Sequence, residues 1–344
     1  MLEKGIIVAP PTARSLGPCL DATRTTALQR VANRPIVCHV LDAMRDAGVV
    51  EVALVVPSEA ADELVACIAN EAPTGVEVHP LVCERGGERG DAMGAALELV
   101  GEDPCILHRA DGLLGQPLLP FIELLREDAL DLLLARQAER DAKHLRLVAG
   151  WADGAADLAG LCVLGRGALR RVRDVEWPAT GLDFAVLAEQ MSRRGGRVEV
   201  GAVRGWRHFE GDTLDLLDMN RMLLDALEPE STPIDDDGNR FEGRVVIHPT
   251  ARVMSSVIVG PVIVGADAVI ADAYVGPHTA IGERVRIQGA EIERSIVLAD
   301  ASILHIGGRL VASVVGRDVR IFRDFSVPRA MRLQVADGDE VALC

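Results

Sequence analysis

Lysine is almost absent from this 344-residue sequence, because Lys4 and Lys143 are the only two and nearly every other cation is an arginine. Chemistry that needs a lysine therefore has two candidates. Acidic residues outnumber basic ones by 52 to 36, which gives a formal net charge of −16. Nucleic acids and anionic membranes are bound through basic surfaces. The charge balance argues against both as partners and leaves a small phosphate-bearing ligand, held by a local group of arginines or backbone N–H groups.

Paired cysteines and long apolar runs are also missing. The seven cysteines are scattered, odd in number and without a Cys-x-x-Cys pair. This argues against a disulfide framework or a zinc site and predicts reduced thiols. No apolar segment reaches membrane-spanning length, and the first apolar run, residues 5–9, is too short for a secretory signal. We therefore expect a cytoplasmic protein that is not bound to a membrane.

Residues 1–228 alternate short apolar runs with amphipathic helical patterns. Strands are expected at 5–9, 50–57, 76–82 and 104–111, and helices at 35–47, 58–71 and 90–100. This alternation predicts an α/β domain with a mixed, mostly parallel sheet covered on both faces. Ligands bind such sheets beyond the carboxyl ends of the strands. The places to look for a site are therefore residues 9–14 and 108–112.

A second pattern follows a polar, proline-marked linker at 229–242. Aliphatic residues then recur every six positions, at Val257, Ile263, Val269, Val275, Ile281 and Ile287. A hexapeptide period predicts a left-handed parallel β-helix, here at 243–344, in which each coil is buried against its neighbours. The flat faces of such a helix usually pack against a partner, so we expect an oligomer.

Three stretches carry a resemblance to a known family. They are "LQRVANRPIVCHVLDAMRDAGVVEVALVV" at 28–56, "GWRHFEGDTLDLLDMNRMLLDAL" at 205–227 and "RAMRL" at 329–333. Together they resemble the sugar-1-phosphate nucleotidylyltransferases, and most closely the long-form glucose-1-phosphate thymidylyltransferases. The resemblance implies a Rossmann-like nucleotidyltransferase domain followed by the β-helix. It also implies a nucleoside triphosphate and a hexose 1-phosphate as ligands, which the family joins into a nucleotide sugar with release of pyrophosphate.

The phosphate loop departs from the family pattern. Residues 10–18, "PPTARSLGP", stand where the family has a glycine-rich loop. Pro10 and Pro11 donate no N–H and have a fixed φ, and Ala13 carries a Cβ where glycine is expected. This loop cannot bind a triphosphate in the usual way. Arg14 is the nearest arginine, and we take it as a candidate catalytic and nucleotide-binding residue.

The family's catalytic-loop lysine corresponds to Thr26. Arg24 is a candidate replacement for its charge, as is Arg30, although a guanidinium fork differs from an ammonium on another stem. The alternative is that both are solvated surface cations.

Only one of the family's two metal-binding carboxylates has a counterpart in this sequence. The resemblance places the first at Asp111, in "HRADGLL", which makes Asp111 our candidate catalytic and metal residue. The alternative is an aspartate that opens a turn before Gly112. The second carboxylate corresponds to Phe209, which cannot bind a cation, so any Mg²⁺ would be held through Asp111 only. His108 and His208 flank these positions and leave a rebuilt metal site open.

Ligand recognition is weakened as well. Asp183 is the one acidic candidate for a contact with sugar hydroxyls. Arg85 and Gly90, in "CERGGERGDAMG" at 83–94, are candidate nucleotide contacts, although this stretch is equally a flexible surface loop.

These departures predict a degenerate homologue without normal pyrophosphorylase activity. It would act as a nucleotide- or sugar-phosphate-binding, regulatory or assembly paralogue, as a homo-oligomer or beside an active paralogue. The alternatives are an active glucose-1-phosphate thymidylyltransferase or another transferase in the same cleft. A further alternative is an acyltransferase site in the β-helix, where His278 and His305 are the only histidines well inside the repeat.

Overall fold

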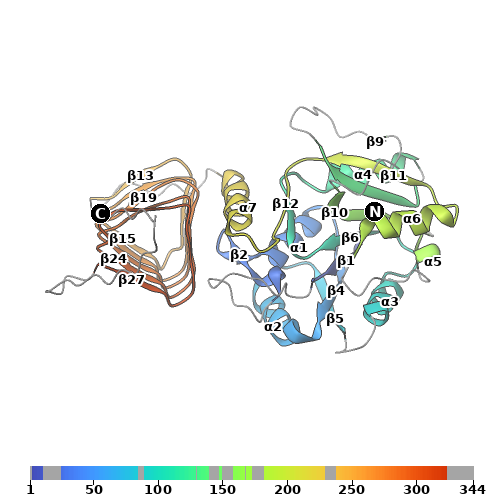
Figure 1. Ribbon diagram of the computed structural model, residues 1–344, viewed down its shortest axis with the longest axis horizontal. Coiled ribbons are helices and arrows are strands. Elements are labelled where there is room, and N and C mark those ends of the chain that lie inside the picture. Colours follow the sequence, from blue (N-terminus) through green and yellow to red (C-terminus); the bar gives the residue numbers. More distant parts are fainter. Residues whose placement is uncertain are drawn as a thin grey trace, which may run out of the picture.

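The computed structural model describes residues 2–10, 25–83, 89–128, 130–138, 147–148, 158–166, 168–172, 182–228 and 238–323. An α/β domain and a parallel β-helix lie next to each other along the long axis of the molecule (Figure 1). None of the helices in these ranges combines the length and the apolar character that a bilayer crossing requires.

A mixed eight-stranded sheet forms the centre of the α/β domain. Its strands are β1 (Lys4–Val8), β4 (Glu51–Pro57), β5 (Glu77–Cys83), β6 (Cys105–Arg109), β8 (Leu132–Gln137), β9 (Leu147–Val148), β10 (Leu158–Leu164) and β11 (Val198–Val203). Their order is β5-β4-β1-β6-β10-β8-β11-β9. The first four are parallel, and β10 runs antiparallel between β6 and β8. The prediction of a mixed, mostly parallel sheet is confirmed.

Helices cover both faces of this sheet. They are α1 (Ile36–Asp46), α2 (Ala61–Glu71), α3 (Arg89–Val100), α4 (Leu119–Asp128), α5 (Leu169–Val172), α6 (Phe184–Arg193) and α7 (Thr213–Asp225). Short elements complete the domain: η1 (Thr26–Leu28), η2 (Ser58–Ala60), β2 (Arg30–Val31), β3 (Arg34–Pro35), β7 (Gly112–Leu114) and β12 (Trp206–His208).

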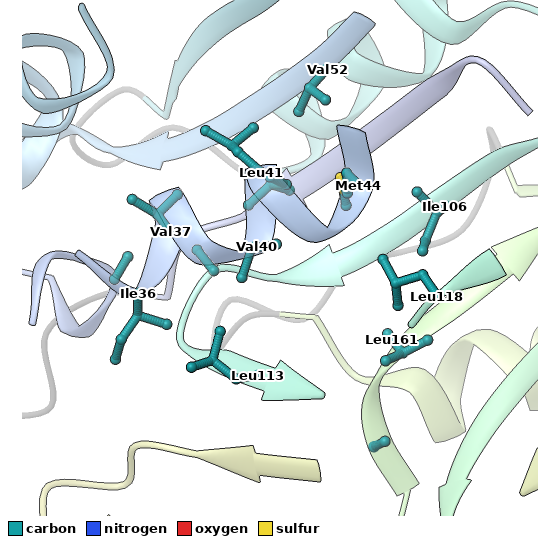
Figure 2. Packing of buried hydrophobic residues seen from close by; sticks show 14 of the residues in the cluster. Ile36, Val37, Val40, Leu41, Met44, Val52, Ile106, Leu113, Leu118 and Leu161 are labelled. Carbon is teal, nitrogen blue, oxygen red and sulfur yellow. The ribbon is translucent and has the colours of Figure 1, made fainter. Parts of the chain in front are cut away.

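The alternation of strand side chains divides the domain into two apolar clusters. Ile7 of β1 belongs to the cluster of α1, while Ile6 and Val8 belong to the cluster of α3 and α6. Figure 2 shows the first cluster, in which the apolar face of α1 packs with Val52 of β4 and Ile106 of β6. The helix predicted at 35–47 is therefore present, with its periodic apolar residues buried.

The β-helix contains three five-stranded parallel sheets. Their strands are β13 (Arg240–Glu242), β16 (Val257–Val259), β19 (Tyr274–Val275), β22 (Glu291–Glu293) and β25 (Arg309–Val311); β14 (Val245–Ile247), β17 (Val262–Val264), β20 (Thr279–Ile281), β23 (Ile296–Val297) and β26 (Val314–Val315); and β15 (Arg252–Met254), β18 (Val269–Ala271), β21 (Arg286–Gln288), β24 (Ser302–Leu304) and β27 (Arg320–Phe322). This left-handed parallel β-helix confirms the predicted fold, and its first strand begins at Arg240.

The aliphatic residues that recur every six positions, however, do not all point into the core of the β-helix. Arg240 pairs with Val257 and Val257 with Tyr274, so one coil takes 17 residues. Three full hexapeptides would need one residue more, so each of these two coils has one shorter corner, whereas the last coil, in which Glu291 pairs with Arg309, takes 18 residues. Val257 is consequently half-buried while its neighbour Ile258 is fully buried, and the series enters the core only at Val275.

The two domains are joined through α7, which lies on the side of the α/β domain that faces the β-helix (Figure 1). The fully buried Asn220 accepts a hydrogen bond from Ala32 N at 2.9 Å and donates one to the His278 carbonyl oxygen at 3.0 Å. Asn33 Nδ2 donates to the Ile281 carbonyl oxygen at 2.7 Å. Ile296 of the β-helix even belongs to the apolar cluster of α1. The β-helix therefore fixes the segment at 30–35 that follows the candidate phosphate loop.

Candidate functional site

The carboxyl ends of β1 and β6 lie side by side at the centre of the sheet. Val8 pairs with Arg109, and Ala110 N donates to the Val8 carbonyl oxygen at 2.9 Å. β1 has β4 on one side and β6 on the other, which is the type of position where α/β sheets bind ligands. Pro10 and Asp111 follow these two strand ends, so the structure brings residues 9–10 of the first predicted place next to the second, while residues 11–14 lie outside the described residues.

Asp111 is bound by an arginine from its own strand end. Nε and Nη2 of Arg109 donate to Oδ1 and Oδ2 of Asp111 at 2.9 and 2.8 Å. Thr26 Oγ1, in η1, adds a longer hydrogen bond to Oδ2 at 3.4 Å. Asp111 is only 1% exposed, whereas the Arg109 side chain is 32% exposed. The carboxylate therefore lies behind the guanidinium and faces it with both oxygens.

The charge on Arg109 is stabilised by this arrangement. Burial works against the charged form, but the hydrogen bonds and the negative charge of Asp111 outweigh it and raise the pKa of Arg109 above its ordinary value. A bidentate, charge-assisted pair of this kind is among the stronger polar contacts in proteins. Arg109 and Asp111 therefore act as one fixed unit.

Two glycines and a tryptophan make room for this unit. A Cβ on Gly160 would stand 2.6 Å from Arg109 Cδ and 2.6 Å from Trp206 Cζ2, and a Cβ on Gly112 would stand 2.2 Å from Trp206 Cη2. Trp206 itself is 7% exposed, and its backbone N–H donates to Gln137 Oε1 at 2.9 Å. Bare backbone at these two positions lets the indole and the arginine stem lie across the sheet.

Replacing Gly160 with Ala is expected to lower the free energy of unfolding by about 1–3 kcal/mol, because the added methyl group overpacks the space that Arg109 and Trp206 occupy. Chemical unfolding followed by tryptophan fluorescence measures this loss. Gly94 is the matched control, since a Cβ there meets nothing within 4 Å. Equal stability of the two variants would contradict the packing described here.

The position of the family's second metal carboxylate is filled by an apolar side chain. Phe209 is 2% exposed and belongs to the core cluster of α1, and its N–H donates to the Asp111 carbonyl oxygen at 3.0 Å. The adjacent Glu210 is exposed and accepts from His208 Nε2 at 2.7 Å. Glu210 thus forms a hydrogen bond with His208 on the surface instead of bonding near Asp111.

The two candidate histidines, His108 and His208, have different hydrogen-bond partners. His108 is 2% exposed, and its Nδ1–H donates to the Arg109 carbonyl oxygen at 2.6 Å. His208 pairs with Glu210. Both rings pack against Trp206, with centroid distances of 5.5 and 6.2 Å. They serve the packing around the indole, and nothing in their contacts brings them together as metal ligands.

The protein is expected to lose stability in acid through His108, because burial lowers the pKa of His108 from 6.5 to about 4. As the pH falls, His108 becomes protonated near pH 6.5 in the unfolded chain but only near pH 4 in the folded protein. His108 therefore subtracts about 3 kcal/mol from the free energy of unfolding between pH 7 and pH 4. Unfolding at both pH values measures it, and the decrease should be smaller by that amount in His108→Asn. An identical decrease in both proteins would be the contrary result.

These residues do not fit a magnesium ion. Mg²⁺ is held in proteins through one or two carboxylates, and both oxygens of Asp111 already face the positively charged Arg109 and accept hydrogen bonds from it. Across the residues that the structure describes, no three His, Cys, Asp or Glu side chains gather where they could hold a metal.

The other predicted site residues have separate positions. Asp183 is the N-cap of α6, where its Oδ1 accepts from Ala185 N and Val186 N at 2.9 and 3.1 Å. Gly90 lies in the first turn of α3. Arg14, Arg24 and Arg85 lie outside the described residues. The roles assigned to these five residues stay predictions.

Arg30 and His278, two further candidates from the sequence, both make structural contacts. Arg30 Nη1 donates to the Asn33 carbonyl oxygen at 2.7 Å and its Nη2 pairs with Glu71. It therefore holds the β2–β3 turn on α2. His278 Nε2 contacts Asp225 Oδ1 of α7 at 2.9 Å, so this histidine forms part of the junction between the domains.

Sequence reasoning missed Arg109. The signal was present in "HRAD", because an arginine at the end of a strand can reach an aspartate two residues later in the turn that follows. Gly160, which leaves space for the Arg109 side chain, is distant in sequence. Only the pairing of β10 with β6 shows that the two residues are neighbours.

Comparison with known proteins places this geometry in context. The chain is 27% identical, over 99% of its length and 99% of the relative, to a glucose-1-phosphate thymidylyltransferase of Streptomyces antibioticus. It is 28% identical to the protein of that name from Streptomyces griseus, over 97% of this chain and 98% of the relative. The low-salt glycan biosynthesis nucleotidyltransferase Agl11 of Haloferax volcanii is 24% identical over 99% of this chain and 100% of its own length. No family model matches the sequence.

A solved structure supports the fold. A putative glucose-1-phosphate thymidylyltransferase from Bacillus anthracis, crystallised with sucrose, superposes with a TM-score of 0.52 over 63% of this chain and 94% of its own. Its sequence identity is 17%, so this likeness concerns the fold alone. With the full-length relatives, it confirms the resemblance to the sugar-1-phosphate nucleotidylyltransferases.

Proposed function

We propose that this homologue of the sugar-1-phosphate nucleotidylyltransferases binds a nucleotide or sugar phosphate at the ends of β1 and β6 without the family's usual pyrophosphorylase activity. In this proposal it acts as a binding, regulatory or assembly paralogue. The observation that supports it most is the contact of both Asp111 oxygens with Arg109, because Asp111 is the one metal carboxylate that the family resemblance leaves.

The argument rests on charge. In-line attack on an α-phosphorus develops negative charge, which the family neutralises with Mg²⁺ together with arginine and lysine. Here Thr26 stands in the lysine position, Phe209 in that of the second carboxylate, and Asp111 is already paired. Removing one such stabilising group costs about 10²–10³ in rate. Losing several together leaves too little for efficient nucleotidyl transfer.

An active glucose-1-phosphate thymidylyltransferase is the second candidate. It is favoured by the name of the Streptomyces relatives, which match this chain from end to end, and by Asp111 at the expected strand end. In that case Arg14 and Arg24 supply the cationic charge.

The expected partner is a second copy of this chain or an active paralogue. One face of the β-helix, that of β14, β17, β20, β23 and β26, packs on the α/β domain through Ile296 and Val314. We expect such contacts on the faces of the other two sheets. This assembly and the cytoplasmic location stay predictions.

A thermal-shift panel tests the binding function. Nucleoside triphosphates, hexose 1-phosphates and nucleotide sugars are each added with and without Mg²⁺. We expect at least one phosphate ligand to raise the unfolding temperature, because ligand bound only to the folded state stabilises it. Sulfate at matched concentration controls for general anion effects. If no ligand shifts the temperature, the binding function is wrong and an assembly role is what is left.

A further inference from the structure

We propose that Arg109 takes the place of the magnesium ion at the ends of β1 and β6 and binds a phosphate group of the ligand directly, so that binding needs no metal. This inference rests on the proposed function, because it specifies how the same strand ends hold the ligand.

The order of the charges from solvent inward carries the inference. The Arg109 side chain is 32% exposed, while Asp111 behind it is 1% exposed. An anion that approaches the strand ends therefore meets the guanidinium first. A metal ion that approaches meets the same positive charge, which repels it from the carboxylate.

Arg109 has donors left for a ligand. The pair with Asp111 uses one N–H of Nε and one of Nη2, in a guanidinium that carries five. Among the described residues, no other side chain or carbonyl accepts from this guanidinium. A planar guanidinium with free N–H groups on one edge suits the oxygens of a phosphate. Asp111 then acts as a positioning residue that orients the guanidinium.

The arginine is also held in place before any ligand arrives. Its stem crosses Gly160 beside the Trp206 ring, and Thr26 contacts the same carboxylate as Arg109 does. A side chain fixed in this way loses little conformational freedom on binding. The ligand class that this site fits is a phosphate monoester or polyphosphate, as carried by sugar phosphates and nucleotides.

Calorimetric titration of dTTP, and separately of glucose 1-phosphate, into the full-length protein tests the inference. Each titration is made in EDTA and in excess Mg²⁺. We expect dissociation constants that agree within about threefold between the two conditions. Asp111→Asn should weaken this binding about three- to tenfold, because Arg109 is no longer oriented, and the binding that is left should still be independent of Mg²⁺. The double variant R109L/D111N, which leaves no buried charge unpaired, should weaken binding by about 10- to 100-fold.

Arg166→Leu is the matched control, because Arg166 is an exposed arginine that follows β10 at the opposite edge of the sheet. It should bind like the wild type. Binding that appears only with Mg²⁺ and disappears in Asp111→Asn would overturn the inference while the proposed binding function stands. Absence of binding by the wild type under both conditions would instead overturn the proposed function itself.

Discussion

Replacing Arg109 with Leu is expected to lower the free energy of unfolding by about 3 kcal/mol. Asp111 is 1% exposed, so the variant leaves a carboxylate buried without the cation that now bonds both of its oxygens. Thr26, at 3.4 Å, is the one other side chain in contact with this carboxylate among the described residues, and it cannot supply a charge. The penalty is the cost of an unpaired buried charge, which exceeds that of removing the pair as a whole.

Urea unfolding followed by tryptophan fluorescence measures this effect, because all three tryptophans lie in residues 1–228 and report on the α/β domain. The double variant R109L/D111N should regain most of the lost stability, since two neutral side chains replace the pair. The surface variant Arg166→Leu should change stability by less than about 0.5 kcal/mol. If Arg109→Leu lowers the free energy of unfolding no more than Arg166→Leu does, then Arg109 does not pair with Asp111 as described.

Replacing Asn220 with Ala is expected to cost about 2–4 kcal/mol. The buried amide satisfies Ala32 N and the His278 carbonyl oxygen, which belong to different domains. Its removal leaves a backbone donor and a backbone acceptor unpaired, and each such group costs about 1–3 kcal/mol. The loss should affect both domains, because Asn220 is bonded to each of them.

Calorimetric unfolding of the full-length protein measures this loss. Asn70→Ala is the matched control, since Asn70 is exposed on α2 and donates only to the Ala66 carbonyl oxygen of its own helix. Its expected effect is below about 0.5 kcal/mol. Equal unfolding temperatures for Asn220→Ala and Asn70→Ala would show that the buried amide is not a link between the domains.

The fold was accessible from the sequence because burial imposes periodicity. The apolar positions of α1 and the continuous apolar run of β4 each follow from the face or faces that the element buries. Which residues of each β-helix coil face the core could not be predicted in the same way. A corner that is one residue shorter shifts the inward position from Val257 to Ile258, and no single spacing in the sequence announces this shift.

The candidate site was accessible only in part. Asp111 was found because the family resemblance places a metal carboxylate there and because it follows the end of a buried parallel strand, where ligands bind. What Asp111 contacts could not be derived, because the space for Arg109 depends on Gly160 and Trp206, which the fold brings together from other strands. Asp183 is different, since an aspartate directly before an amphipathic run is also the common pattern of a helix N-cap, and the structure shows that cap.

The most direct test of the central claim is the release of pyrophosphate from dTTP and glucose 1-phosphate in the presence of Mg²⁺. The wild type and Asp111→Asn are assayed side by side, after binding of both ligands has been measured. The account predicts no release above the background without protein, and no difference between the two proteins. Release by the wild type that Asp111→Asn abolishes would contradict it and would establish an active nucleotidylyltransferase that uses Asp111.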